Sequence, residues 1–175
     1  MLGFAVDPKR PLNTLPICMR ARLKHYRSLE EVAEDPDVDL VDLTLPIEVM
    51  PAAIKLFLSL GKHVISEKPG APSVATGIEL MEHHARLERP VVWAVAENWR
   101  FKKTTQLVED IVASGVLGEI RFADFTYLSF QKPDNQRWRG SPGYAGGYIL
   151  DSGVHFIALL RKIVGEIDED RKSVV

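Results

Sequence analysis

A charged pair stands where an apolar strand ends. In the stretch HVISEKPG, residues 63–70, Glu67 and Lys68 follow the strand directly and Pro69 stops it. Ligands of open parallel sheets bind beyond the carboxyl ends of the strands, so the pair is predicted to lie at the mouth of a cleft. The alternative is a surface ion pair without a function, worth about 0–1 kcal/mol.

A carboxylate and an imidazole form the second candidate for chemistry. Asp151 and His155 stand four residues apart in GGYILDSGVHFIALL, so they are predicted to share one face of a helix. The helix is otherwise apolar, which favours burial, and a buried carboxylate that holds one tautomer of an imidazole makes it a general base. The alternative is that Asp151 caps the helix and His155 is a satisfied core histidine.

Strands and helices alternate in the part of the chain that must position Lys68. Apolar periodicity predicts strands over residues 38–46, 62–66 and 90–98, and helices over residues 28–35, 49–60 and 74–85. A capping box, Ser28 with Glu31, opens the first helix. Short connections between such elements are typical of parallel strands with crossover helices, the α/β class. We therefore predict an α/β domain over residues 1–98.

The pattern changes after Asn98. A helix is predicted over residues 104–114, then a long strand over residues 119–130, a loop over residues 132–147 and an apolar helix over residues 150–165. We therefore place a domain boundary near residues 98–103, so that residues 99–175 form a second domain.

Composition excludes several classes of protein. The net charge is −2 and the basic residues are dispersed, which argues against nucleic acid and anionic membranes as partners. The single Cys18 excludes an internal disulfide framework and a multi-cysteine metal site. His83 and His84 sit on a helix without a third ligand, so no metal is expected. The first residues do not resemble a signal peptide, and a cytoplasmic location is expected.

Four motifs together carry a family resemblance. EKP after one strand, AENWRF after the next, WRG in a loop and GGYILDSGVHF on a helix resemble the Gfo/Idh/MocA family, named after glucose–fructose oxidoreductase, inositol dehydrogenase and MocA. The resemblance runs from about Tyr26 to Gly165. It implies a Rossmann domain for NAD or NADP and a second α+β domain built on a largely antiparallel sheet. It also implies hydride transfer to or from a hydroxyl-bearing carbon of a sugar, cyclitol or related polyol.

The resemblance implies catalytic roles for Lys68, Asp151 and His155. His155 would take the hydroxyl proton, Asp151 would orient the imidazole, and Lys68 would stabilise the developing alkoxide. These three residues, with Asn98 and Arg100, are also the implied contacts of the substrate. Arg100 has a structural salt bridge as an equally weighted alternative.

The family pattern also implies a set of cofactor contacts. They are the strand-end loop and the EKP pair on the sheet, and a tryptophan–arginine pair in the later loop: Leu45, Pro46, Ile47, Glu67, Lys68, Trp138 and Arg139. The other tryptophans, Trp93 and Trp99, are interpreted as packing residues.

One family feature is absent from the sequence. Gly3 is the only glycine in the first 60 residues, so there is no G-x-G-x-x-G loop to hold a pyrophosphate. The resemblance thus implies an incomplete NAD(P)-binding Rossmann-like domain over residues 1–98, with residues 1–25 of doubtful origin, and a partial α+β domain for substrate binding and oligomerisation over residues 99–175. We expect this incomplete copy to bind NAD or NADP weakly and to form a homo-oligomer through its second-domain sheet. Two hypotheses stay open: an oxidoreductase or a fragment of one, or a non-catalytic relative that acts as a ligand-sensing or protein-binding regulatory module.

Overall fold

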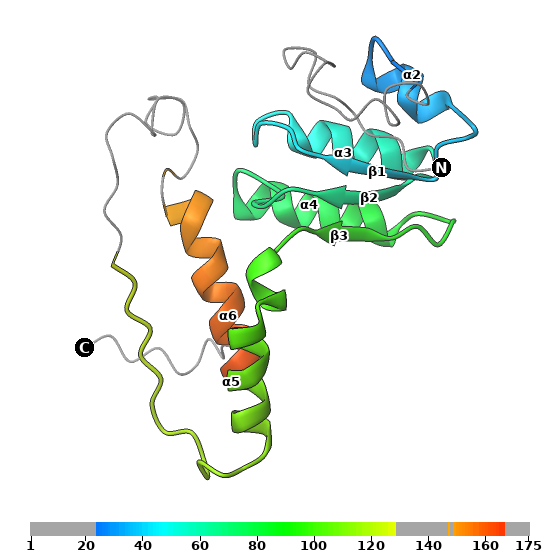
Figure 1. Ribbon diagram of the computed structural model, residues 1–175. Helices are drawn as coiled ribbons and strands as arrows, with labels where there is room; N and C mark the ends of the chain where they lie inside the picture. Colours follow the sequence, from blue (N-terminus) through cyan, green and yellow to red (C-terminus); the bar gives the residue numbers. More distant parts are fainter. Residues whose placement is uncertain (1–23, 129–146, 148, 167–175) are drawn as a thin grey trace, which may run out of the picture. The chain divides into compact units, whose positions relative to one another are not determined.

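The chain divides into two compact units, Met1–Ala96 and Glu97–Val175 (Figure 1). The structure, a computed structural model, describes residues 24–128, 147 and 149–166. In that part of the chain no helix is long and apolar enough to cross a membrane.

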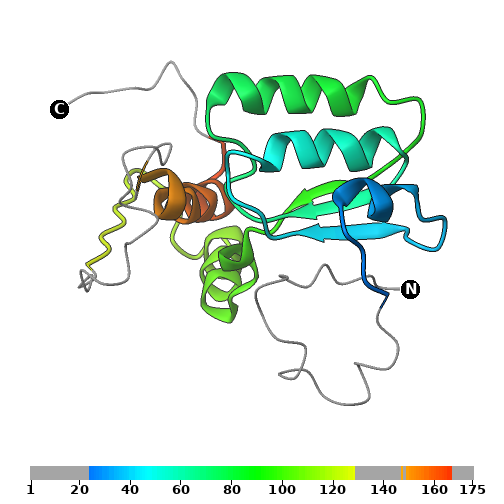
Figure 2. The same cartoon turned by 90° about the horizontal axis from the view of Figure 1, so that it is seen from above.

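The first unit is built on a three-stranded parallel sheet. Its strands β1 (Leu40–Leu43), β2 (His63–Ser66) and β3 (Trp93–Val95) lie in the order β1-β2-β3. The connections run through α3 (Met50–Ser59) and α4 (Val74–Ala85). Figure 2 shows both helices on the same side of the sheet. This follows because each strand is added next to the previous one in the same direction and both crossover connections have the same hand. The predicted α/β class with a parallel, Rossmann-like sheet is confirmed.

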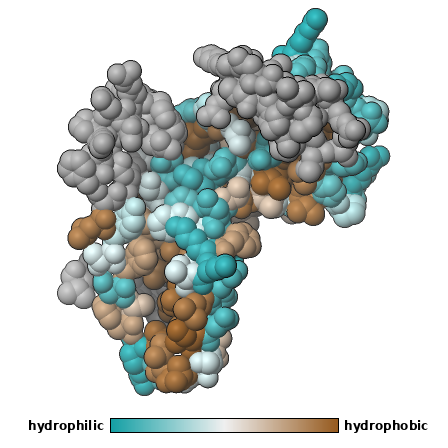
Figure 3. Space-filling model, in the orientation of Figure 1, coloured by the Kyte–Doolittle hydropathy of each residue, from teal (hydrophilic) through white to brown (hydrophobic). Residues whose placement is uncertain are grey.

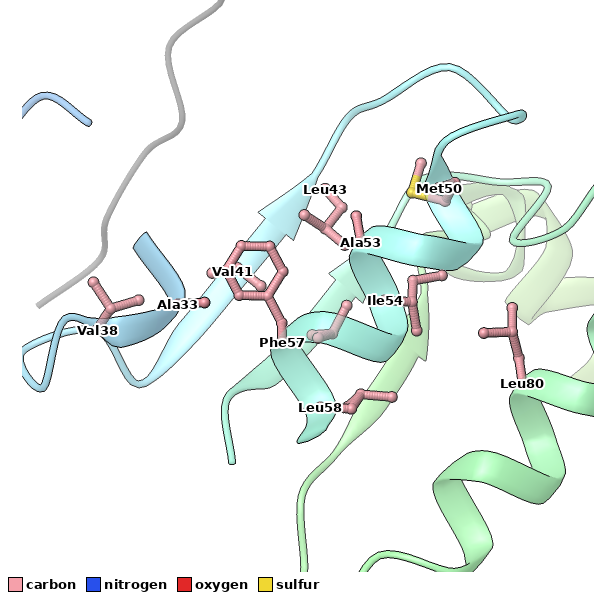
Figure 4. Packing of buried hydrophobic residues seen from close by; sticks show 11 residues of the cluster. Ala33, Val38, Val41, Leu43, Met50, Ala53, Ile54, Phe57, Leu58 and Leu80 are labelled. Carbon is pink, nitrogen blue, oxygen red and sulfur yellow. The ribbon is translucent and has the colours of Figure 1, made fainter. Parts of the chain in front are cut away.

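The core of this unit lies between the sheet and α3. Phe57, Ile54 and Leu58 on α3 are at most 1% exposed, and Val64 at the centre of β2 is 0% exposed. Figure 4 shows the α3 side chains against those of β1, with Leu80 of α4 beside Ile54. Because β2 is the middle strand, its short apolar run is covered by its neighbours and by α3.

Local signals at helix ends explain why these elements begin and end where they do. Helix α2 (Leu29–Glu34) starts at Ser28, whose hydroxyl accepts a hydrogen bond from the Glu31 amide at 3.2 Å, so the predicted capping residue is confirmed. Helix α3 is followed by Gly61 at φ +77°, a conformation in which glycine carries no steric penalty.

Helix α4 has a second apolar stripe that does not face the core. Leu80 is 0% exposed, whereas Val74, Ile78 and Met81 are 81%, 51% and 67% exposed. Their spacing of four and three residues puts the three side chains along one face of the helix, and this face lies on the surface.

The carboxylate of Asp35 links residues 24–26 to the end of α2 through several hydrogen bonds. The side chain of Asp35 is 3% exposed and accepts hydrogen bonds from the Lys24 ammonium, from the Tyr26 hydroxyl at 2.6 Å and from the Asp37 amide at 2.9 Å. These donors, the Lys24 ammonium first, hold the pKa of Asp35 well below its ordinary value. In addition, the Lys62 ammonium donates to the Asp35 carbonyl oxygen at 2.7 Å.

Replacing Asp35 with Asn is expected to destabilise the protein in a pH-dependent way. A carboxyl whose pKa is lowered by folding stabilises the native state above its unfolded pKa of about 3.9, and that contribution is lost as the pH falls further. The urea midpoint of Asp35→Asn should therefore lie below that of the wild type near neutral pH, and the gap should shrink in acid. The matched control is Asp42→Asn, at an exposed position of β1; an equal, pH-dependent loss there would contradict the assignment to Asp35.

The second unit consists of helices in its described part. These are the 3₁₀-helix η2 (Asn98–Phe101), α5 (Lys103–Ala113), the π-helical turn η4 (Ile149–Gly153) and α6 (Val154–Val164). Helices α5, α6 and η2 pack on one another. The ammonium of Lys162 on α6 lies 2.7 Å from a carboxylate oxygen of Glu109 on α5.

The strand predicted over residues 119–130 is wrong in its described part. Residues 119–128 form no strand. Aromatic and β-branched residues give this segment a strand-like pattern, but a strand exists only as a ladder of hydrogen bonds, and no described residue pairs with it. The largely antiparallel sheet implied for this unit stays a prediction.

The second unit exposes a large amount of apolar surface. Leu107, Val108 and Ile111 on α5 are 59%, 42% and 39% exposed, and Val116 and Leu117 after it are 75% and 60% exposed. Figure 3 shows this apolar surface at the lower end of the unit. Exposed apolar patches of this kind are typical of surfaces that another element or chain covers.

Candidate active site

The carboxyl ends of the strands in the first unit are joined by hydrogen bonds. The Glu67 amide donates to the Leu43 carbonyl and the Ala96 amide donates to the Ser66 carbonyl, at 2.9 and 2.8 Å. Since β1 and β2 pair with Leu43 opposite Ser66, the loop after β1 and the Glu67–Lys68 pair leave the sheet at the same edge. This is the edge at which open parallel sheets bind ligands.

The residues proposed for the cofactor at this edge differ in exposure. Ile47 is 4% exposed, Leu45 is half-buried against the core, and Pro46 and Glu67 are exposed. Lys68 is half-buried, its amide donates to the Glu67 carboxylate at 3.1 Å, and the peptide bond that joins it to Pro69 is cis.

A buried hydroxyl supports the loop that carries Lys68. Ser66 is 0% exposed and accepts a hydrogen bond from the Trp93 indole N–H at 3.1 Å. A Cβ atom placed on Gly70 would lie 3.4 Å from the Trp93 ring and 3.6 Å from Val95, so the loop passes close over β3. Trp93 therefore packs as the sequence indicated, and its indole also anchors the end of β2.

In the second unit, His155 on α6 binds a carboxylate that the sequence analysis did not consider. Its Nδ1 lies 2.6 and 2.8 Å from the two carboxylate oxygens of Glu97, and the side chains are 13% and 12% exposed. Oxygen Oε1 of Glu97 also accepts a hydrogen bond from the Trp99 amide at 3.0 Å, which caps η2. The sequence held a signal for this residue, because Glu97 follows a strand just as Glu67 does.

Trp99 is the centre of an aromatic cluster in this unit. Its ring stacks on the His155 imidazole with centroids 4.8 Å apart and an interplanar angle of 8°. Phe156 and Tyr127 meet it edge-on at 5.5 and 6.1 Å, and the Lys102 ammonium lies 3.5 Å from the ring centroid. Interpreting Trp99 as a packing residue was therefore incomplete, since it also fixes the plane of the imidazole.

Asp151 lies close to His155 in sequence but in a different kind of helix. It is 6% exposed and belongs to the π-helical turn η4, whereas α6 begins at Val154. The helix predicted over residues 150–165 is therefore present, but its first turn is π-helical and only the part from Val154 is α-helical. Asp151 lies inside the helical run that includes Ile149 and not before it, so it does not occupy an N-cap position. π-Helical turns occur often at functional sites.

The proposed substrate residues Asn98 and Arg100 are both exposed on η2. Glu166 has a lowered pKa, caused first by hydrogen bonds from Arg161 and also by the charge of Arg100. This effect does not distinguish between a substrate contact and a structural salt bridge for Arg100, and both stay predictions.

Several predictions concern residues or relationships that the structure leaves open. Trp138 and Arg139 lie outside the described residues. The convergence of Lys68, in the first unit, with Asp151 and His155, in the second, stays a prediction. Among the described residues there is no group of three or more His, Cys, Asp or Glu side chains that could hold a metal ion.

Comparison with protein families matches both parts of the chain. Residues 6–96 match the family described as an oxidoreductase family with an NAD-binding Rossmann fold, and residues 105–172 match the GFO/IDH/MocA C-terminal domain. The chain belongs to the Gfo/Idh/MocA family of oxidoreductases. The family resemblance drawn from the four motifs is thus confirmed.

Two curated relatives of this Gfo/Idh/MocA protein are similar over most of its length. Dehydrogenase FPY6 of Fusarium mangiferae is 35% identical over 153 residues, which are 85% of this chain and 44% of that protein. The scyllo-inositol 2-dehydrogenase (NADP(+)) IolW of Bacillus subtilis is 30% identical over 129 residues, 74% of this chain and 36% of that protein. The chain therefore spans less than half the length of these relatives.

A solved structure of the family shares the fold. The WlbA dehydrogenase of Bordetella pertussis, in complex with NADH and UDP-GlcNAcA, has a TM-score of 0.70 and 26% identity. The match covers 83% of this chain and 42% of that one.

The residues at the sheet edge fit part of a nicotinamide dinucleotide. Two neighbouring strand ends, after Leu43 and after Ser66, open toward the same edge, which is the position such cofactors take on parallel sheets. The pyrophosphate of a dinucleotide usually binds a glycine-rich loop at a helix N-terminus, and the sequence contains no such loop. The fit thus extends to the strand-end contacts and not to the pyrophosphate.

Proposed function

We propose that this chain carries the catalytic residues of an NAD(P)-dependent oxidoreductase acting on a hydroxyl-bearing carbon of a sugar, cyclitol or related polyol. The observation that carries the proposal is the half-buried His155 imidazole, bound through Nδ1 to a carboxylate, in a chain of this oxidoreductase family. The names of the relatives support the substrate class, since one is a scyllo-inositol dehydrogenase and another was solved with a UDP-sugar acid.

The reaction divides between the cofactor and the protein. A nicotinamide, when bound, would supply the acceptor for the hydride. The protein must take the proton from the hydroxyl as the carbon–hydrogen bond breaks and the carbonyl forms. Since Nδ1 of His155 is engaged by Glu97, the proton goes to Nε2. Lys68 would stabilise the developing alkoxide with its ammonium, and Asp151 would contribute a second carboxylate.

The contacts with the dinucleotide are assigned to the sheet edge. Leu45, Pro46 and Ile47 would pass beneath it and Glu67 would face the ribose of its nicotinamide half, with Lys68 near the ring. Trp138 and Arg139 would reach it from the later loop. The choice between NAD and NADP has no identified residue in this chain.

The regulatory alternative has less support than the enzyme. A module that only binds a ligand or a protein needs neither a lysine at the sheet edge nor an imidazole oriented by a carboxylate. The relatives described above are named as dehydrogenases, which also supports catalysis.

We retain two further proposals, a homo-oligomer and a cytoplasmic location. The exposed apolar side chains of α5 and of the residues after it support association, because burying them against a second copy would remove them from water. The composition, with a net charge of −2, is compatible with a cytoplasmic protein.

The test is an assay of NAD and NADP reduction with a panel of sugars and cyclitols, on this chain and on any longer product of the same gene. Dinucleotide binding by this chain alone, measured by titration calorimetry, is expected to be weaker than micromolar because the glycine loop is absent.

In the active form, Lys68→Met should lower kcat by about 10²–10³-fold, the usual effect of removing one donor from a developing oxyanion.

The matched control is Lys55→Met, because Lys55 on α3 forms a loose surface ion pair with Glu79 at 3.6 Å. Absence of turnover with every polyol in both proteins, or equal turnover of Lys68→Met and wild type, would overturn the proposed function.

A further inference from the structure

Three residues of the second unit form a closed set of contacts. The Glu97 carboxylate binds His155 Nδ1, Glu97 Oε1 binds the Trp99 amide, and the Trp99 indole stacks on the His155 ring. Each residue is therefore held by the other two. The side chains of Glu97 and His155 are 12% and 13% exposed, so water has little access to the pair.

The hydrogen-bonding capacity of a carboxylate decides where the imidazole proton lies. An ionised carboxylate only accepts hydrogen bonds, and both Glu97 oxygens lie within 2.8 Å of Nδ1. Nδ1 must therefore carry the proton. In the neutral ring the lone pair is then on Nε2, the nitrogen that the proposed reaction uses as base.

We propose that Glu97 is a positioning residue that locks neutral His155 in the Nδ1–H tautomer, with Trp99 fixing the plane of the ring. This inference rests on the proposed function only for its catalytic consequence, because the tautomer is a property of the ground state. It assigns to Glu97 the orienting role that the sequence analysis gave to Asp151. Asp151, in the preceding π-helical turn, keeps its place as a proposed catalytic residue.

Two other histidines are expected to hold the opposite tautomer and serve as internal references. Nδ1 of His63 accepts a hydrogen bond from the Val92 amide at 2.9 Å, so a neutral His63 carries its proton on Nε2. Nε2 of His84 lies 2.8 Å from the Val91 carbonyl oxygen and must donate to it. His155 is therefore expected to be the Nδ1–H tautomer beside two Nε2–H rings in one protein.

The experiment is a long-range ¹H–¹⁵N correlation spectrum of the ¹⁵N-histidine-labelled chain, at a pH high enough for the rings to be neutral. The His155 signals are assigned by their loss in His155→Gln. We expect Nδ1 of His155 to have the shift of a protonated nitrogen and Nε2 that of an unprotonated one, and the reverse for His63 and His84.

Glu97→Gln tests the cause. The glutamine amide can donate to Nδ1, so the His155 signals should move toward the Nε2–H pattern while His63 and His84 keep theirs. The matched control is Glu109→Gln, which removes the same charge from the ion pair with Lys162 in the same unit and should leave His155 unchanged. In the active protein, Glu97→Gln should lower kcat about 100-fold or more with little change in KM.

A wild-type His155 in the Nε2–H form, or a Glu97→Gln spectrum identical to that of the wild type, would overturn the proposal. If Glu97→Gln does not fold, as judged by circular dichroism, the wild-type spectrum decides alone. The spectrum requires neither dinucleotide nor substrate. An Nδ1–H ring in a protein that oxidises no polyol would therefore refute the proposed function and leave the tautomer assignment standing.

Discussion

His155→Ala is expected to lower kcat for polyol oxidation by about 10²–10⁴-fold, the usual contribution of a positioned general base. The variant removes an imidazole that is held in position by both a carboxylate, Glu97, and a stacked ring, Trp99. Substrate binding should change less than turnover, because proton removal occurs in the transition state and not in the ground-state complex. The measurement is steady-state reduction of NAD or NADP with the best substrate of the panel.

The matched control is His83→Ala on α4. Nε2 of His83 forms a hydrogen bond with the Ser59 hydroxyl at 3.0 Å on an exposed part of the first unit. Removing the His83 imidazole should leave kcat unchanged. Full turnover in His155→Ala would remove the imidazole from the mechanism. A loss of similar size in both variants would indicate a general effect of the substitutions on the fold instead.

Phe57→Ala is expected to lower the free energy of unfolding by about 3–5 kcal/mol, the range for truncating a buried aromatic ring. Phe57 is 1% exposed and packs between α3 and β1, where Figure 4 shows Val41 beside its ring. The neighbouring strand is held by its ladder and cannot move far to fill the space, so a cavity remains. Urea denaturation followed by far-ultraviolet circular dichroism measures the change.

Phe122→Ala is the matched control for this effect. Phe122 is 84% exposed, so the same atoms are removed without opening a cavity, and the change should stay within about 0.5 kcal/mol. Comparable losses in the two variants would show that burial of Phe57 does not account for its contribution.

The first unit could be predicted from the sequence because its signals are local. The Ser28 cap, Gly61 after α3 and Pro69 after β2 each lie within a few residues of the boundary that they set. The strands between them are short apolar runs whose neighbours in the sheet are also their neighbours in the chain. Once the strands were predicted along the chain, their order in the sheet followed almost directly.

The second unit could be predicted only in part because its decisive contacts are distant in sequence. Glu97 and His155 are 58 residues apart, and no periodicity links them. Residues 119–128 show the reverse case, a strand-like composition without a described partner strand. The π-helical turn at Asp151 has no signal of its own in the sequence. A single turn of this kind before α6 needs no change in the spacing of the apolar residues around it.

The double use of one Glu97 oxygen, by the Trp99 amide and the His155 ring, has an evolutionary consequence. A substitution of Glu97 or His155 alters two contacts at once, and a substitution of Trp99 removes the ring that stacks on His155, so the effect of each depends on what the other two positions hold. Single steps away from this trio should be selected against, and descendants that lose one member should tend to lose the others. Positions 97, 99 and 155 are thus expected to be inherited as a unit.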